Sequence, residues 1–273
     1  MRGPVIHVGN DVVDLEDPRT FGKAGDERFT ARVLDAAGLA AVRGAEDPDL
    51  ELWCRWAAKE AAYKVVSKLT GEPPPFVHRA FVVAWDRSET PIGTGEAVGV
   101  TTCLVRSGGV THEGRPIPVR VMCHFEAGRR CAVHALAVSN PTADSNLTAD
   151  SKPTAGARQR GVTWGLDLLD RPSTAWYGPL DDLMRRFSVR ELDAVRTRRS
   201  AAVRLAARAS VAERLGVAEE RIEIVCDPGT FGRRPPRVLL DGAPADADVS
   251  LSHDGRWIAW SSWTSGGPLA GSA

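Results

Sequence analysis

The chain has 273 residues, of which 35 are basic and 35 acidic, so its formal net charge is zero. A neutral chain lacks the basic excess of a protein that coats DNA or RNA, and a hydrophobic content of 43% is too high for global disorder. No apolar run approaches the roughly 20 residues of a membrane span, and no signal peptide is visible. We therefore expect a cytoplasmic globular protein that binds neither nucleic acid nor membrane and keeps its five scattered cysteines reduced.

The first half opens with a predicted strand at residues 5–8 and continues to a long helix predicted over 50–69. Asp47 can cap this helix, Pro48 suits its first position, and Gly71 can end it. Alternating apolar residues separated by glycine-containing turns then predict strands at 76–85, 97–106, 119–125 and 131–138. One helix followed by an antiparallel meander is an α+β pattern.

A polar segment at 141–160 contains proline and repeats Thr-Ala-Asp-Ser, which is typical of a flexible linker. It divides the chain into an N-terminal subdomain (1–140) and a C-terminal subdomain (161–263), followed by a tail (264–273). The second half repeats the plan of the first. We predict a strand at 162–169, one long helix over 189–215, and strands at 221–226, 237–240, 249–253 and 257–260.

The two halves also share short sequence similarities in the same order. Gly9-Asn10-Asp11-Val12-Val13-Asp14 aligns with Gly165-Leu166-Asp167-Leu168-Leu169-Asp170, Ala57–Ala61 with Ala206–Ser210, and Val121–His124 with Leu251–His253. We infer a tandem duplication. The expected fold is α+β, with two similar subdomains packed as a pseudo-dimer, each an antiparallel sheet on a long helix.

The first long helix places a carboxylate among aromatic residues. Helical spacing puts Trp53, Trp56, Glu60 and Tyr63 on one stripe, and a buried unpaired carboxylate is costly. One interpretation is an ordinary Glu60–Lys64 pair on the surface. The other is a metal ligand or base held on a rigid helix. Three of the five lysines, at 59, 64 and 68, cluster in this helix of an arginine-rich chain, which indicates a need for compact positive charge.

Asp11 and Asp14 follow the first predicted strand. They can cap a turn, or they can join Glu60 in a hard oxygen site suited to Mg²⁺ and a phosphate-bearing substrate. No P-loop or Gly-x-Gly-x-x-Gly motif supports a general nucleotide binder.

The last strands carry Ser250-Leu251-Ser252-His253. Neighbouring strand residues point to opposite faces, which argues against Ser252 and His253 acting as a nucleophile pair. The basic turn at 232–237 either binds phosphate or is a solvated loop. Five arginines on the second long helix either attract an acidic partner or reflect composition; they are Arg196, Arg198, Arg199, Arg204 and Arg208.

Together these motifs resemble the 4′-phosphopantetheinyl transferase superfamily. The matching motifs are Gly9-x-Asp11, Trp56-x-x-Lys59-Glu60-Ala61-x-x-Lys64 and Ser250-x-Ser252-His253. The segment 27–34 and the Gly232-Arg233-Arg234-Pro235 turn also look like parts of that family. The motif order, with Ser-x-Ser-His last, is similar to that of the small holo-acyl-carrier-protein synthases, although the length is that of fused two-subdomain members.

The resemblance implies a transferase that moves 4′-phosphopantetheine from coenzyme A to a serine of an apo acyl, polyketide or peptidyl carrier protein and releases 3′,5′-ADP. It implies that Asp11 and Glu60, with Asp14 as a third candidate, hold Mg²⁺, and that Glu60 is the base. Lys64 and His253 would contact phosphate oxygens, with Ser252 beside them and Arg19, Arg233 and Arg234 as weaker candidates for the nucleotide phosphates.

The duplication divides these groups between the halves. The first half has Asp11, Glu60 and Lys64, whereas Ser252 and His253 lie in the second, so one composite site is expected in a monomer. Asp167 would be a structural relic. The alternative function is a non-catalytic, carrier-protein-binding or regulatory module with the same fold. The sequence does not distinguish among the carrier proteins or their fatty-acid, polyketide and peptide pathways.

Overall fold

The structure is a computed structural model that describes residues 6–86, 96–97, 100–126, 129–140, 161–172, 174–230 and 232–265. The linker expected at 141–160, most of the tail after Thr264, and residue 5 of the strand expected at 5–8 lie outside these ranges. Antiparallel sheets and several helices make the fold α+β, as expected. Within the described ranges, no helix is both long and apolar enough to cross a membrane.

The elements before residue 140 include one long helix and a large antiparallel sheet. The helices are α1 (Glu27–Val33), α2 (Ala36–Gly44) and α3 (Pro48–Thr70), with 3₁₀ turns at Pro18–Thr20, Lys23–Gly25 and His78–Ala80. The strands are β1 (Val8–Asp14), β2 (Val82–Trp85), β3 (Glu96–Ala97), β4 (Val100–His112), β5 (Arg115–Glu126) and β6 (Arg129–Val138). They form a sheet in the order β1-β6-β5-β4-β2, with β3 paired to β4.

The elements after residue 160 form three smaller sheets around a second long helix. The helices are α4 (Leu180–Met184), α5 (Val189–Leu192) and α6 (Arg198–Leu215), with a 3₁₀ turn at Glu219–Arg221. The strands are β7 (Gly161–Leu168), β8 (Ile222–Val225), β9 (Pro228–Gly229), β10 (Gly232–Arg233), β11 (Arg237–Leu240), β12 (Ala243–Pro244), β13 (Ala247–Asp254) and β14 (Trp257–Thr264). The sheets are β13-β14-β7, β12-β11-β8 and β10-β9.

Helix α3 begins and ends where its sequence signals predict. The Asp47 side chain accepts a hydrogen bond from the Leu50 N–H, Pro48 occupies the first turn, and Gly71 ends the helix with φ of 80°. Alanines and valines of α3 pack against one face of the large sheet. Gly9 allows this close contact, because a Cβ at that position would lie 2.0 Å from the Ala61 carbonyl oxygen.

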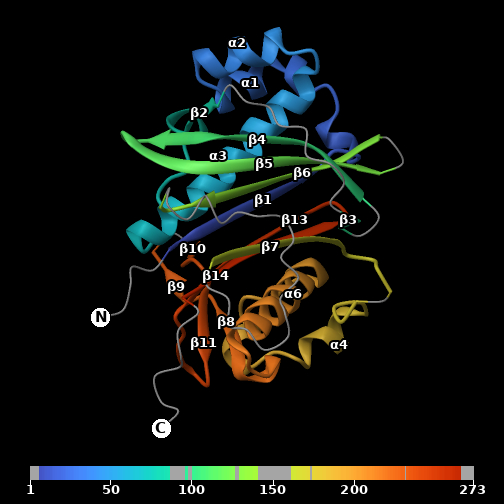
Figure 1. The fold of residues 1–273 in the computed structure, drawn as a ribbon, viewed down its shortest axis with the longest axis vertical. Coiled ribbons are helices and arrows are strands. Elements are labelled where there is room, and N and C mark those ends of the chain that lie inside the picture. The colour runs from blue at the N-terminus through green and yellow to red at the C-terminus, as the bar shows by residue number, and fades with distance from the viewer. Residues whose placement is uncertain are drawn as a thin grey trace.

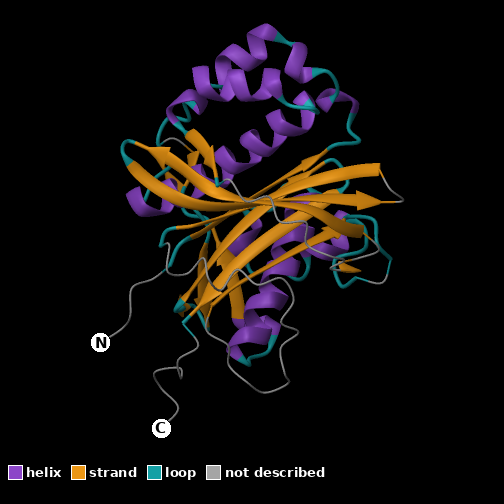
Figure 2. Cartoon of the chain, turned by 45° about the horizontal axis from the view of Figure 1, so that its top comes forward, coloured by secondary structure: helices purple, strands orange, loops and turns teal. Residues whose placement is uncertain are grey.

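The opposite face of the large sheet packs against the β13-β14-β7 sheet. Val12 shares an apolar cluster with Leu166 and Ala259, and Leu136 shares another with Val162 and Trp263. Helix α6 packs behind the second sheet through a cluster that includes Val203, Ala206 and Ile258. The order is therefore helix, sheet, sheet, helix, with both sheets in the middle of the molecule (Figures 1 and 2).

Three predicted elements differ from the structure. The helix expected over 189–215 is two helices, because Thr197 caps a new helix that begins at Arg198. Only Val82–Trp85 of the strand expected at 76–85 is formed, and residues 78–80 make a 3₁₀ turn. Strand β1 extends to Asp14, so Asp11 and Asp14 lie within the strand instead of following it.

Candidate active site

The site forms where strands β1 and β13, each at an edge of its sheet, lie beside one another. Side-chain oxygens of β13 accept hydrogen bonds from alternate N–H groups of β1. The pairs are Val8 with Asp248 (2.7 Å), Asn10 with Ser250 (3.0 Å), Val12 with Ser252 (3.2 Å) and Asp14 with Asp254 (3.0 Å). Each pair is 240 residues apart in sequence. We call this contact the seam.

Two lysines of α3 complete the seam by binding carbonyl oxygens from both strands. Lys64 Nζ donates to the carbonyls of Asn10 (2.6 Å) and Leu251 (3.4 Å) and to the Asp11 carboxylate (3.1 Å). Lys68 Nζ donates to the carbonyls of Val8 (2.7 Å) and Val249 (2.5 Å) and to the Asp248 carboxylate (2.7 Å). Because the two lysines are one helical turn apart, both reach the same pair of strand edges.

A cavity of about 500 Å³ opens along the seam. It is lined by six of the residues that the sequence singled out: Asp11, Lys64, Arg233, Arg234, Ser252 and His253. They come from β1 and α3 on one side and from β10, its following turn and β13 on the other. The structure thus brings the N-terminal acid and lysine together with the C-terminal serine and histidine.

Asp11 is the most perturbed acid of this cavity. Its Oδ1 accepts hydrogen bonds from the Ser252 hydroxyl (2.8 Å) and from Lys64. Burial raises the pKa of Asp11 to about 6; Lys64 opposes this shift, and the negative charge of Glu60 adds to it. The carboxylate is therefore buried beside a second acid and is neutralised by an ammonium group.

Glu60 lies on α3, one turn before Lys64, and is not among the residues that line the cavity. Its Oε1 is 3.7 Å from Nε2 of His78, whose ring stacks on Trp56 with centroids 4.5 Å apart. The sequence predicted Lys64 as its ion-pair partner, but Lys64 donates to the carbonyls of the seam and to Asp11. The negative charge of Glu60 helps to raise the pKa of Asp11.

Positive and neutral donors line the other side of the cavity. His253 is partly open to solvent; burial of the remaining ring and the guanidinium of Arg199 lower its pKa, which favours the neutral imidazole. Arg233 donates to the carbonyls of Cys226 (3.0 Å) and Asp193 (2.6 Å). Arg234 binds Glu72 at 3.0 Å and so links the two halves. These groups suit a ligand with several phosphate oxygens.

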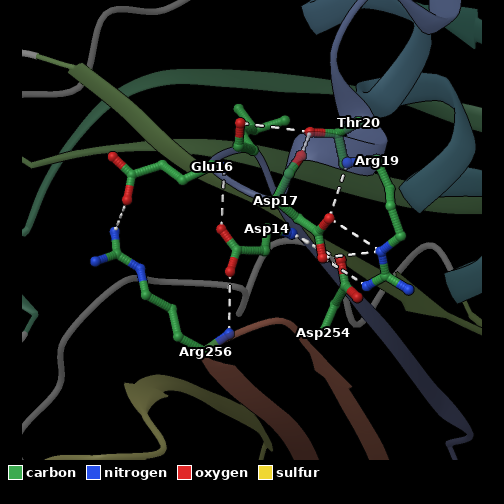
Figure 3. Close-up of polar contacts among 8 residues, drawn as sticks. Asp14, Glu16, Asp17, Arg19, Thr20, Asp254 and Arg256 are labelled. Atoms are coloured by element: carbon green, nitrogen blue, oxygen red, sulfur yellow. Dashed lines mark hydrogen bonds and ion pairs between the residues drawn. The ribbon is translucent and has the colours of Figure 1, made fainter.

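Asp14 and Arg19 are not among the residues that line this cavity. Figure 3 shows their polar contacts. Residues three apart on a strand point to opposite faces, so Asp14 faces away from Asp11. Its carboxylate accepts hydrogen bonds from the N–H groups of Glu16 and Arg256, both at 3.0 Å. Arg19 is exposed and binds Asp17 at 2.5 Å. Asp14 thus holds the β13–β14 turn.

The expected three-carboxylate metal site is not formed. Among the residues that the structure describes, no group of three His, Cys, Asp or Glu side chains is placed to hold a metal ion. Asp14 lies within β1 and points away from Asp11, whereas the sequence analysis placed it after the strand. What remains of the expected set is the pair Asp11 and Glu60.

Sequence analysis named three further residues of the cavity without placing them in the site. Arg204 of α6 lines the cavity and is only 8% exposed. Like the buried Arg208, it belongs to the protein interior and not to an exposed basic surface. Lys68 and Ser250 also line the cavity. The signal for Lys68 was the lysine cluster, which indicated a need for compact positive charge. In the structure, each of the three ammonium groups of this cluster binds backbone carbonyls.

Comparison with known families identifies the N-terminal part of this arrangement. Residues 7–103 match the model of the 4′-phosphopantetheinyl transferase superfamily. This segment of the chain is similar to that superfamily. The segment includes β1 and α3, which supply Asp11, Glu60 and Lys64. The resemblance inferred from the sequence motifs is thereby confirmed.

A curated relative agrees with this assignment. The chain is 34% identical over 74 residues to a holo-[acyl-carrier-protein] synthase of Shewanella amazonensis. The match covers 27% of this chain and 59% of that synthase, so the chain spans about three fifths of the relative's length. The similarity to the superfamily therefore lies in the part of the chain that contains Asp11 and Lys64.

Proposed function

We propose that this protein is a phosphopantetheinyl transferase that moves 4′-phosphopantetheine from coenzyme A to a serine of an apo carrier protein. The single observation that supports this best is the cavity at the seam. Asp11 and Lys64 from the superfamily segment meet Ser252 and His253, which lie about 190 to 240 residues later, around one space of about 500 Å³. A non-catalytic binding module would have no need for this convergence.

The proposed reaction needs charge neutralisation more than covalent help from the enzyme. The carrier serine Oγ attacks the β-phosphorus of coenzyme A, so a new O–P bond forms. The bond from this phosphorus to the bridging oxygen breaks, and 3′,5′-ADP leaves with the electron pair. The proton of the serine passes to Glu60, directly or through a water molecule. Lys64, His253, Arg233 and Arg234 bind phosphate oxygens and hold the pyrophosphate in line.

The residues present fit a divalent cation. Mg²⁺ commonly uses one or two protein carboxylates together with substrate phosphates. Asp11 and Glu60 provide such a pair, and the raised pKa of Asp11, caused first by burial and increased by Glu60, indicates negative charge that a cation would stabilise. When bound, Mg²⁺ would neutralise the pyrophosphate. Asp11 and Glu60 would hold it, while Lys64 is freed from Asp11 to bind phosphate.

The arrangement of the two halves also supports a pseudo-dimer. In each half, a long helix packs on an antiparallel sheet whose strand carries the Gly-x-Asp sequence, β1 in one and β7 in the other. Asp167, the counterpart of Asp11, accepts a hydrogen bond from the Leu168 N–H and has no place in the cavity. We propose that one duplicated unit kept the acidic groups and the other kept Ser-x-Ser-His, in a monomeric cytoplasmic enzyme.

The test is a transfer assay with purified protein, Mg²⁺, coenzyme A and apo carrier proteins of fatty-acid, polyketide and peptide synthesis. We expect mass spectrometry to show the addition of one phosphopantetheine group to at least one carrier. Asp11→Asn, which keeps the shape of the side chain, should lower the rate by at least 100-fold. Asp167→Asn is the matched control and should leave the rate within about twofold, because its carboxylate lies outside the cavity. Absence of transfer to every carrier, with coenzyme A still bound, would favour a binding module.

A further inference from the structure

The serines of the seam do not by themselves define how β1 and β13 align. Ser250 and Ser252 carry the same hydroxyl two positions apart, and both accept from N–H groups of β1. A shift of β13 by two residues would still offer a hydroxyl to the Asn10 N–H. Hydroxyl-to-amide bonds therefore tolerate more than one alignment, whereas the cavity requires one.

Lys68 makes contacts that only one alignment allows. Its ammonium group donates at the same time to the carbonyls of Val8 and Val249 and to the carboxylate of Asp248. The same carboxylate oxygen accepts from the Val8 N–H at 2.7 Å. All three hydrogens of the ammonium group are used, and an alignment shifted by two residues would separate Lys68 from Asp248. Both charges would then be buried without a partner, at a high cost in free energy.

Lys64 and Lys68 differ in how accessible they are. The Lys64 side chain is 27% exposed, and its bond to Leu251 is long at 3.4 Å. The Lys68 side chain is 4% exposed, and none of its three bonds exceeds 2.7 Å. Lys64 can turn to a phosphate in the cavity, whereas Lys68 has no hydrogen left to donate.

We propose that Lys68, paired with Asp248, is a positioning residue that fixes the alignment of β1 with β13 and so holds Asp11 opposite Ser252 and His253. It keeps the two halves of the cavity aligned when Lys64 turns to the substrate. This inference rests on the proposed function for its effect on transfer, but not for its effect on the seam. It assigns to Lys68 no contact with the reacting atoms.

The experiment replaces Lys68 with methionine, which keeps the apolar stem and removes the ammonium group. We expect hydrogen exchange, measured by NMR, to rise at least tenfold for the amides that bond to β13: Val8, Asn10, Val12 and Asp14. The amides of Gly9, Asp11 and Val13, which face β6, should stay within about twofold. Turnover at saturating substrates, per folded molecule, should fall by about 10- to 100-fold.

Two further variants separate positioning from stability. Asp248→Asn keeps an acceptor for the Val8 N–H and removes only the charge. If Lys68→Met does not fold, the same measurements are made on Asp248→Asn. The double variant should be no slower than the slower single variant, because both act through one pair. Arg208→Met is the control: Arg208 is 6% exposed and lies 3.8 Å from Glu191, away from the seam. It should lose stability but keep its turnover per folded molecule.

The outcomes are distinct. Unchanged exchange of the four seam amides in folded variants would overturn the inference. Faster exchange with unchanged turnover would overturn the positioning role, because the alignment would not matter for transfer. If the wild-type protein transfers nothing, the proposed function fails, and the exchange pattern alone then decides whether Lys68 fixes the seam.

Discussion

Gly9 shows how a single residue sets the distance between a helix and a sheet. We predict that Gly9→Ala lowers the free energy of unfolding by about 3 kcal/mol, because the added Cβ would lie 2.0 Å from the Ala61 carbonyl oxygen and α3 would have to move. Urea unfolding followed by tryptophan fluorescence measures this change.

The control for this prediction is Gly44→Ala. Gly44 ends α2, and an added Cβ there would meet no atom within 4 Å. Alanine should therefore change stability by less than about 1 kcal/mol, in the stabilising direction. Equal losses at the two glycines would contradict the role of Gly9 in the packing of α3.

Two buried histidines predict how stability depends on pH. Burial lowers the pKa of His124 to about 4 and that of His134 well below its usual value. Below pH 6.5 the unfolded chain binds protons at these positions and the folded chain does not, so acid favours unfolding. Between pH 6.5 and 5 each histidine should reduce the free energy of unfolding by about 2 kcal/mol.

His134→Phe tests this expectation. Between pH 6.5 and 5, the free energy of unfolding should fall by about 2 kcal/mol less in the variant than in the wild type, as measured by urea unfolding. Parallel pH dependences of the two proteins would show that His134 is protonated in the folded state.

Single residues were only partly predictable from the sequence. Lysine in an arginine-rich chain indicated compact positive charge, and the ammonium groups of Lys59, Lys64 and Lys68 all bind carbonyl oxygens. Asp14 lies within β1 and, being three residues from Asp11, faces the opposite side of the strand, whereas the sequence analysis placed both acids after the strand. Arg204 was noted only as part of a basic helix, and its burial could not be foreseen because it depends on residues far away in the chain.

At the scale of elements, the start of α6 allows a direct test. The Thr197 side chain accepts a hydrogen bond from the Ser200 N–H, and the Ser200 side chain bonds back to the Thr197 N–H. Thr197→Ala should therefore lower the free energy of unfolding by about 1 kcal/mol. Thr197→Ser keeps the hydroxyl, so this variant should retain most of the stability that the alanine variant loses. Equal thermal stability of the alanine and serine variants would contradict the cap.

Elements with local signals were predicted well. The N-cap, first-turn proline and C-terminal glycine of α3 all act within a few residues, so the predicted span of 50–69 is close to Pro48–Thr70. The helix expected over 189–215 was too long because Thr197 was not interpreted as a cap. The strand expected from residue 76 begins only at Val82, since Phe76 stacks on Tyr63 with centroids 4.3 Å apart and belongs to a loop over α3.

At the scale of the whole molecule, the cavity predicts that ligand binding stabilises both halves together. Its walls come from β1 and α3 as well as from β10 and β13. Mg²⁺ and coenzyme A at 100 times the dissociation constant should raise the free energy of unfolding by about 2.7 kcal/mol in one transition. Asp11→Asn should lose the part that depends on Mg²⁺. Calorimetry that resolves two transitions, with only one shifted by ligand, would contradict a shared site.

The meeting of the halves was predictable, but the way they meet was not. Incomplete motif sets in the two halves indicated a composite site, and the cavity contains Asp11, Lys64, Ser252 and His253. Nothing local to Ser250 or Ser252 indicates that their hydroxyls accept from a strand 240 residues earlier. Such pairings depend on the tertiary fold, which short-range patterns do not encode.

The outer edge of β1 depends on side chains of β13, and not on a neighbouring strand of its own sheet, for its hydrogen-bond partners. This dependence has a consequence for biosynthesis. A ribosome makes this strand some 240 residues before the Asp and Ser oxygens that cover its amides. Until then the nascent sheet presents a bare row of N–H groups, which is a template for association with other polypeptides. The last strands to be translated are thus what protects the first one from aggregation, and truncated products of this protein should precipitate where the full-length chain stays dispersed.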